Sequence, residues 1–212
     1  MNSSAWDSHY DRERSNLNYP DENLLRLLKK TGHTPTLVST ALDLGCGSGR
    51  HLALLRDVGY GIVIGTDQSF QALSISRKHN PTLLMQCTNA RIPIKSGIID
   101  IAVAWGSLHY TGKNELSEMI DEIHRLLKNG GILLATLRSS RDTYLKSGHH
   151  LGNNVWVTDL QDLNGATVSF FDKSELDRYF RGFQHSSVGY TERSIVGNTD
   201  KVISHWLIMA KK

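Results

Sequence analysis

The sequence predicts an α/β domain built around a mostly parallel β-sheet, and three observations favour this fold class. Short apolar runs alternate with segments whose apolar residues recur at helical spacing, which is the pattern of repeated strand–helix–strand units. A glycine-rich stretch at residues 45–49 joins one apolar run to the helix that follows. The length of 212 residues suits one domain of ordinary size.

Composition narrows the classes of protein to consider. A hydrophobic fraction of 39% with 21% charged residues is typical of a globular chain rather than a disordered one. The formal net charge of +3 is too small to indicate a nucleic-acid-binding surface. Two cysteines, Cys46 and Cys87, make neither a disulfide framework nor a metal site. With no signal-peptide core and no long apolar window, we expect a cytoplasmic protein with no bound metal and no membrane contact.

Strands are expected where short apolar runs lie between turn residues. The expected strands are 37–44, 62–66, 83–86, 98–105, 132–137, 185–190 and 202–210. The run at 98–105 is almost entirely apolar, so we expect both of its faces to be buried. The last two runs are expected to form a hairpin.

Helices are expected between these strands. Asp21 and Ser69 are candidate caps at the starts of two of them. Apolar residues recur at helical spacing over 116–127, and the glycine pair at 130–131 is expected to end that helix. Residues 139–172 are polar and weakly patterned, which is typical of an irregular binding segment or lid.

The stretch ALDLGCGSGR at residues 41–50 is the most informative part of the chain. Glycines there let the backbone approach a ligand, and the free N–H groups at the next helix start favour a negative group. Asp67 follows the second strand, where an acid can hold ribose hydroxyls. The dinucleotide fingerprint requires glycine at the sixth position, which is Arg50 here, and no Gly-Lys-Ser/Thr phosphate motif is present. The residues therefore predict a nucleoside-bearing ligand.

Five ordered segments carry a resemblance to a known family: LDLGCGSG at 42–49, GTDQS at 65–69, NARIP at 89–93, DIAVAWGSLH at 100–109 and LKNGGIL at 127–133. Together they resemble the motifs of class I S-adenosylmethionine-dependent methyltransferases of the small-molecule type. The resemblance implies a Rossmann-like three-layer sandwich with a mostly parallel seven-stranded sheet and an antiparallel C-terminal strand. It also implies a helical cap at 1–35 and a methyltransferase domain at 36–212, with an acceptor-binding insertion at 139–172.

The resemblance implies that the cofactor is S-adenosyl-L-methionine. Asp67 would take both ribose hydroxyls, Asn89 would accept from the adenine amino group through its carbonyl oxygen, and Asp43 would orient the amino end of the methionyl part. The full set of expected cofactor residues is Tyr10, Arg14, Asp43, Gly45, Cys46, Gly47, Asp67, Gln68, Asn89, Ala90, Trp105 and Gly106. Each also has a structural alternative, as a turn, cap or packing residue.

Methyl transfer needs mainly orientation, because the sulfonium is already an activated donor. A base is needed only for an acceptor that keeps its proton, and His109 is the candidate because it follows the fourth strand. Tyr110, His149 and His150 are expected to line the acceptor site. The Asn/Asp-Pro-Pro-aromatic signature of methyltransferases that act on DNA bases is not found after the fourth strand, so a small-molecule acceptor is expected and nucleic acid is not.

The predicted function is therefore methyl transfer from S-adenosyl-L-methionine to a small molecule by in-line displacement. Two alternatives stay open. One is a non-catalytic protein that binds S-adenosyl-L-methionine. The other is a nucleotide-dependent oxidoreductase, which Arg50 at the sixth fingerprint position disfavours.

Overall fold

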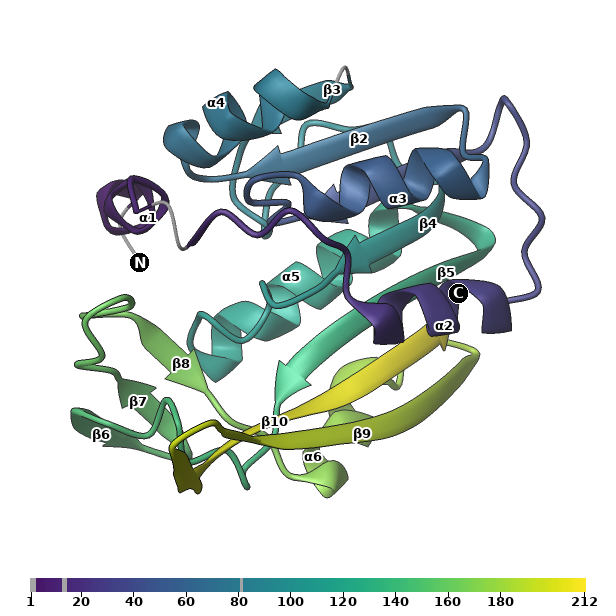
Figure 1. The fold of residues 1–212 in the computed structure, drawn as a ribbon. Helices are drawn as coiled ribbons and strands as arrows, with labels where there is room; N and C mark the ends of the chain where they lie inside the picture. Colours follow the sequence, from purple (N-terminus) through teal and green to yellow (C-terminus); the bar gives the residue numbers. More distant parts are fainter. Residues whose placement is uncertain (1–2, 13–14, 81) are drawn as a thin grey trace.

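The computed structural model describes residues 3–12, 15–80 and 82–212, and a seven-stranded sheet forms its centre (Figure 1). The strand order is β3-β2-β1-β4-β5-β10-β9. The strands are β1 Thr40–Leu44, β2 Ile62–Asp67, β3 Leu83–Gln86, β4 Ile99–Ala104, β5 Leu127–Arg138, β9 His185–Ile195 and β10 Asn198–Lys211. The first five pair in parallel, whereas β10 is antiparallel to both β5 and β9. The expected seven-stranded α/β fold with an antiparallel C-terminal strand is confirmed.

Helices cover both faces of this sheet. The helices are α1 Ser3–Tyr10, α2 Glu22–Lys30, α3 Arg50–Val58, α4 Phe70–His79, α5 Lys113–Leu126 and α6 Lys173–Phe180. In β4, Ile101 and Val103 pack in the cluster that includes α2, α3 and α4, while Ala102 and Ala104 pack in the cluster that includes α5 and α6. Alternate side chains of one strand thus enter two cores, which explains why this run is apolar throughout.

Two helix caps expected from the sequence are confirmed. The Asp21 carboxylate accepts a hydrogen bond from the Asn23 backbone N–H at 2.9 Å, at the start of α2. The Ser69 hydroxyl accepts from the Ala72 backbone N–H at 3.0 Å, at the start of α4. Both caps satisfy N–H groups that have no partner inside the helix.

Two expected boundaries are wrong. The first strand begins at Thr40 rather than at 37, because the Ser39 N–H bonds back to the Thr36 carbonyl and makes a turn that leaves 37–38 exposed. The glycine pair at 130–131 does not end α5, which stops at Leu126 and passes directly into β5. The pair lies instead where the β4–β5 register is irregular, and Gly130 has φ +80°.

The insertion after β5 is more ordered than its polar sequence predicts. Strands β6 (His149–Gly152), β7 (Val155–Val157) and β8 (Thr167–Ser169) form a separate antiparallel sheet. Asn153 and Asn154, with φ +48° and +56°, make the tight turn between β6 and β7, as asparagine pairs do in two-residue hairpins. A small core supports this sheet, formed by Leu145, Ala166, Val168 and Phe170.

The topology marks one edge of the sheet as a ligand site. The chain runs from β1 outward to β2 and β3, and then returns to place β4 on the other side of β1. The strand order therefore reverses between β1 and β4, and ligands of open α/β sheets bind beyond the carboxyl ends of strands at such a point. Among the described residues, no helix combines the length and apolar character that crossing a bilayer requires.

Candidate functional site

The turn after β1 presents bare backbone because its glycines are in the left-handed conformation. Gly45 and Gly47 have φ +65° and +56°. A Cβ on Gly45 would lie 2.5 Å from the Cβ of Ser107, and a Cβ on Gly47 would lie 2.3 Å from the hydroxyl oxygen of Tyr10. The turn therefore needs glycine both for its conformation and for the space around it.

Asp67 ends β2 and faces this turn. One carboxylate oxygen accepts from the Gly47 backbone N–H and the other from the Ser69 backbone N–H, each at 2.9 Å. Burial raises the pKa of Asp67, and these backbone N–H groups oppose the rise. Each oxygen retains a lone pair, so the carboxylate can accept further hydrogen bonds from two neighbouring hydroxyls.

Asp43 is buried in β1, just before the turn, with 1% of its surface exposed. Burial is the main reason that its pKa rises to about 7, with Arg50 lowering the pKa and Asp67 raising it further. Its Oδ2 atom is buried and has no hydrogen-bond partner among the described residues. A cationic donor placed beside Asp43 would satisfy this atom and favour the charged carboxylate.

A cavity of about 310 Å³ opens beside Asp67, and we call it the Asp67 cavity. The lining includes Gln68, Asn89 and Ala90, so the structure brings together three residues that the sequence assigned to one end of a ligand. Lining residues that the sequence analysis missed are Trp6, Cys87, Thr88, Ser107, Thr111, Glu115, Glu118 and Met119. Ser107 is held by a 2.7 Å hydrogen bond from its hydroxyl to the Leu44 carbonyl.

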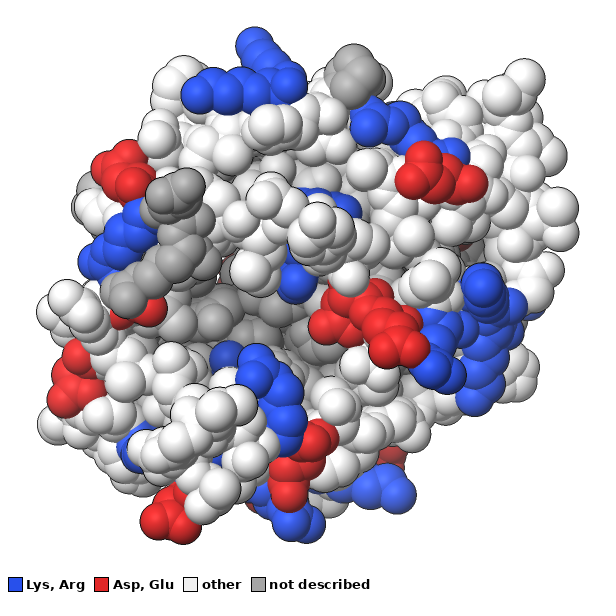
Figure 2. Space-filling model, viewed as in Figure 1, with Lys and Arg blue, Asp and Glu red and all other residues white. Residues whose placement is uncertain are grey.

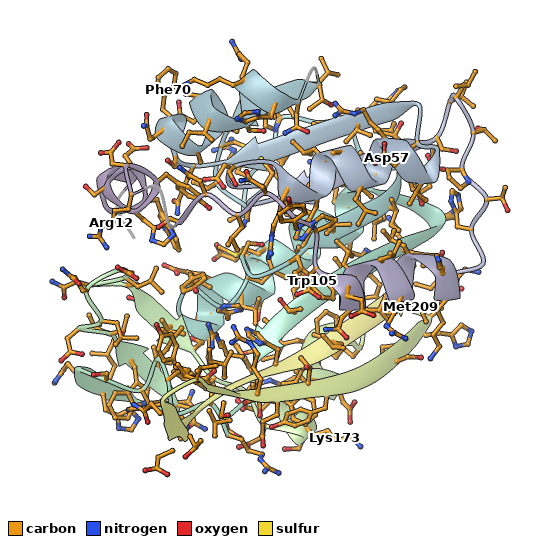
Figure 3. The ribbon with its side chains drawn as sticks, viewed as in Figure 1. Arg12, Asp57, Phe70, Trp105, Lys173 and Met209 are labelled. Carbon is orange, nitrogen blue, oxygen red and sulfur yellow. The ribbon has the colours of Figure 1, made fainter. Side chains whose placement is uncertain are left out.

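A second cavity of about 570 Å³, which we call the His109 cavity, continues from the first. The two share the lining residues Trp6, Tyr10, Gly45, Gly106 and Tyr110. The His109 cavity is also lined by Cys46, Gly47, Trp105 and His109, and it reaches β5, β9 and β10. Figure 3 shows Trp105 near the centre of the molecule, and Figure 2 shows the surface hollowed there.

Helix α1 and the residues just after it contact elements on both sides of these cavities. At one side, the Asp7 carboxylate accepts from the Ser69 hydroxyl at 2.6 Å and so joins α1 to α4. At the other side, the His9 ring lies 2.8 Å from the Asp162 carbonyl oxygen, and the Arg12 guanidinium donates to Asp162 at 3.0 Å (Figure 3). Because Tyr10 lines both cavities from this helix, α1 forms part of their wall.

Comparison with protein families matches residues 42–135 to the methyltransferase domain. This match spans the glycine turn, Asp67 and the strands up to β5. Over these residues the chain carries the domain of the class I S-adenosylmethionine-dependent methyltransferase family. S-adenosylmethionine is the cofactor of that family.

This chain shares only part of the length of its curated relatives. It is 26% identical over 121 residues to a tRNA (carboxymethyluridine(34)-5-O)-methyltransferase of Saccharomyces cerevisiae, covering 56% of this chain and 42% of that protein. It is 28% identical over 113 residues to the mitochondrial arginine-hydroxylase NDUFAF5 of Homo sapiens, covering 53% of this chain and 32% of that protein. The chain thus spans less than half the length of these two relatives.

Solved structures match this chain over nearly all of its fold. A S-adenosylmethionine-dependent methyltransferase from Methanosarcina mazei superimposes with a TM-score of 0.73 at 18% identity. The match covers 88% of this chain and 96% of that one. The likeness extends beyond the sheet core that the family comparison identifies.

His109, which follows β4, is buried, with 1% of its surface exposed. Burial, followed by the charge of Arg138 and by His205, holds the pKa of His109 well below its ordinary value, whereas a hydrogen bond to the Thr136 backbone raises it. The Nδ1 atom has no partner among the described residues. The ring is therefore neutral, and Nδ1 is the position that can accept a proton.

Three residues assigned to the site from the sequence lie elsewhere or outside the description. His149 and His150 are exposed on β6 and line neither cavity, and the His150 ring stacks on Trp156 with centroids 4.7 Å apart. Arg14 falls outside the described residues. Tyr110 lines both cavities, with its ring centroid 4.5 Å from that of His109.

Proposed function

We propose that this chain transfers the methyl group of S-adenosylmethionine to a small-molecule acceptor. The observation that carries the proposal is the continuity of the two cavities at Gly45 and Gly106. A cofactor lying over the glycine turn would extend from the Asp67 cavity into the His109 cavity. The remaining part of the His109 cavity is then the place for the acceptor.

The residues of the Asp67 cavity fit the adenosine part of this cofactor. Asp67 is fixed by two backbone N–H groups and keeps an accepting position on each oxygen for the ribose hydroxyls. Asn89 and Gln68 bring amide groups to the same cavity, and Ala90 brings a backbone N–H. These groups suit the edge of an adenine ring.

The residues around the turn fit the methionyl part. A side chain at Gly45 or Gly47 would collide with its neighbours, so the backbone surface is kept free for a ligand. The unpartnered Oδ2 atom of Asp43 suits the ammonium group. Tyr10, Cys46 and Trp105 line the same region, where Trp105 and Cys46 contribute apolar surface and Tyr10 contributes its ring and hydroxyl.

The cofactor supplies an activated methyl group on a positively charged sulfur. The chain's own residues bind it, orient the acceptor and keep water from the reaction. Correct orientation alone accounts for roughly 7–11 kcal/mol of barrier lowering in well-aligned reactions. His109 would take a proton at Nδ1 from a hydroxyl acceptor, since that atom has no other partner.

A small acceptor is favoured because α1 and the insertion lie over the cavities. The His9 and Arg12 contacts with Asp162 join these two elements, and Tyr144 and Leu163 line the His109 cavity from the insertion side. The yeast relative is named as a tRNA methyltransferase, so an RNA acceptor is the second candidate. An RNA chain would have to displace α1 to place a base in this cavity.

Two measurements test the proposal. Calorimetry with S-adenosylmethionine and S-adenosylhomocysteine should show binding, while reduced nicotinamide cofactor should not bind. Release of labelled methyl should then be measured across hydroxyl, amine and carboxylate small molecules and across a transfer-RNA pool. Methyl transfer to small molecules supports the proposal. Cofactor binding without any transfer would identify a non-catalytic binding protein, and transfer only to RNA would assign the second candidate.

A further inference from the structure

The wall of the His109 cavity that lies farthest from the glycine turn is made by β5, β10 and β9, the lowest strands of the seven-stranded sheet in Figure 1. His205 of β10 pairs with Arg138 of β5 on one side and with Thr191 of β9 on the other. One step along the hairpin, Ile203 pairs with Arg193. Directly paired residues of antiparallel strands point to the same face, so these side chains form one surface. We call this surface the arginine wall.

The arginine wall carries a net positive charge. Arg138 forms a 2.5 Å ion pair with Asp142, a buried residue that also accepts from the backbone N–H groups of Leu145 and Ser204. This pair fixes Arg138 and neutralises it. The Nε atom of Arg138 still has no hydrogen-bond partner among the described residues.

Arg193 supplies the positive charge of the arginine wall that Asp142 does not neutralise. The acid next to it in sequence, Glu192, lies on the opposite face of β9 and is paired with Arg141 at 3.2 Å. In the described part of the chain, Arg193 has no ion pair. Among the residues that line the His109 cavity, the one acid is Asp21, which caps α2 rather than joining this wall. The wall therefore has a net charge of about +1, from Arg138, Asp142 and Arg193 together.

The position of the wall separates it from the cofactor. Across the sheet the strand order is β1, β4, β5, β10 and β9. The glycine turn follows β1, and His109 follows β4. Neighbouring strands lie about 4.8 Å apart, so Arg138 is roughly 10 Å and His205 roughly 14 Å from the line of β1. Arg50, which begins α3 directly after the turn, is a cation on the cofactor side of the His109 cavity. The arginine wall lies on the acceptor side of His109.

We propose that the methyl acceptor is a small molecule bearing one carboxylate, which docks on the arginine wall while its nucleophilic atom points toward His109. This rests on the proposed function. A planar carboxylate matches the fork of a guanidinium, and its single negative charge balances the single unpaired charge of the wall. A phosphate monoester carries about −1.5 to −2 at neutral pH and would exceed that charge.

The test uses protein saturated with S-adenosylhomocysteine and three matched aromatic probes: benzoate, benzamide and phenyl phosphate. We expect benzoate to bind about tenfold more tightly than benzamide and more tightly than phenyl phosphate, by calorimetry or ligand-observed NMR. Arg193→Gln should remove the preference for benzoate, and Arg193→Lys should retain most of it. Arg141→Gln, which changes an arginine on the opposite face, should leave all three affinities unchanged.

Each other outcome overturns the assignment. Equal binding of benzoate and benzamide, no binding of either, or an unchanged preference in Arg193→Gln would show that the wall does not recognise an anion. Tighter binding of phenyl phosphate would replace carboxylate by phosphate. If Arg193→Gln weakens S-adenosylhomocysteine binding, the wall serves the cofactor. Failure of the unaltered protein to bind S-adenosylhomocysteine would instead refute the proposed function, and so is distinguished from failure of this inference.

Discussion

The Asp67 carboxylate accepts a hydrogen bond from the backbone N–H of Gly47 at 2.9 Å. This contact joins the end of β2 to the glycine turn that follows β1, across 20 positions of the sequence. Asp67 therefore shapes the turn as well as facing the ligand cavity. Substitutions at either residue should affect both the shape of the site and its affinity for the cofactor.

Replacing Asp67 with alanine should weaken S-adenosylmethionine binding by about 3 kcal/mol, or somewhat over a hundredfold in Kd. The reason is the loss of charge-assisted hydrogen bonds to the ribose, together with a looser turn at Gly47. Calorimetry gives the Kd, and circular dichroism shows whether the variant is folded. Asp57→Ala is the matched control, since Asp57 is exposed on α3 (Figure 3). A folded Asp67→Ala variant with unchanged affinity would refute the ribose assignment.

Alanine at Gly47 should lower the free energy of unfolding and displace α1. The left-handed conformation alone costs a non-glycine residue about 1–2 kcal/mol, and the new Cβ would lie 2.3 Å from the Tyr10 hydroxyl oxygen. Gly197→Ala separates the two effects, because Gly197 has φ +82° with no atom within 4 Å of an added Cβ. Denaturant unfolding should show Gly47→Ala as the more destabilised variant, and adding Tyr10→Ala should recover part of the difference. Equal losses of unfolding free energy at both glycines would mean that α1 moves away from the added Cβ at no cost in stability.

The sequence predicts the sheet core and the cofactor side of the site well, because those features are local. The glycine turn and Asp67 each lie at the end of an apolar run, and parallel strands bring their carboxyl ends to one edge. The placement of Asn89 in the Asp67 cavity follows from the same rule, since it comes after β3. Such residues can be assigned from their positions along the chain.

The acceptor side could not be predicted in the same way. Arg138 and Arg193 are 55 positions apart and meet only through the register of β10 with β5 and β9. Helix α1 is held by contacts with α4 and with Asp162, which no local pattern encodes. The Asn153–Asn154 pair is a local signal for the β6–β7 hairpin, although the polar character of the insertion favours an irregular segment.

Asp43 should make stability and cofactor affinity depend on pH in opposite directions. Burial raises the pKa of Asp43 to about 7 in the folded chain, whereas an unfolded aspartate has a pKa of about 3.9. The unfolded state therefore loses its proton first as the pH rises, so this residue lowers the free energy of unfolding between about pH 4 and pH 7. The full effect is up to about 4 kcal/mol.

The measurement compares unfolding of the unaltered protein with that of Asp43→Asn across this pH range. The difference in free energy of unfolding should change between pH 4 and pH 7 and stay constant above pH 8. Cofactor binding should strengthen as the pH rises through 7, because an ammonium group favours the carboxylate form, and binding at pH 6.5 should release a proton. A pH-independent difference between the two proteins would show that Asp43 is already ionised in the free chain.

His109→Ala should slow methyl transfer to a hydroxyl acceptor by about a hundredfold to ten-thousandfold, the range for loss of a positioned base. The Kd of S-adenosylhomocysteine should stay within about twofold of its original value, since His109 lines the His109 cavity and not the Asp67 cavity proposed for the adenosine part. The best hydroxyl acceptor found by methyl release provides the assay, with kcat and KM measured separately. Loss in kcat with little change in KM is expected for a proton acceptor.

Two further variants keep this prediction testable even if alanine disturbs the core. His109→Gln retains a polar side chain of similar length but cannot act as a base, so it should fold and still lose most of the rate. His79→Ala changes an exposed histidine at the end of α4 and should retain the full rate. Since the His109 ring is buried against Tyr110 and His205, a His109→Gln protein with the original kcat would show that the histidine packs the cavity wall and takes no proton from the acceptor.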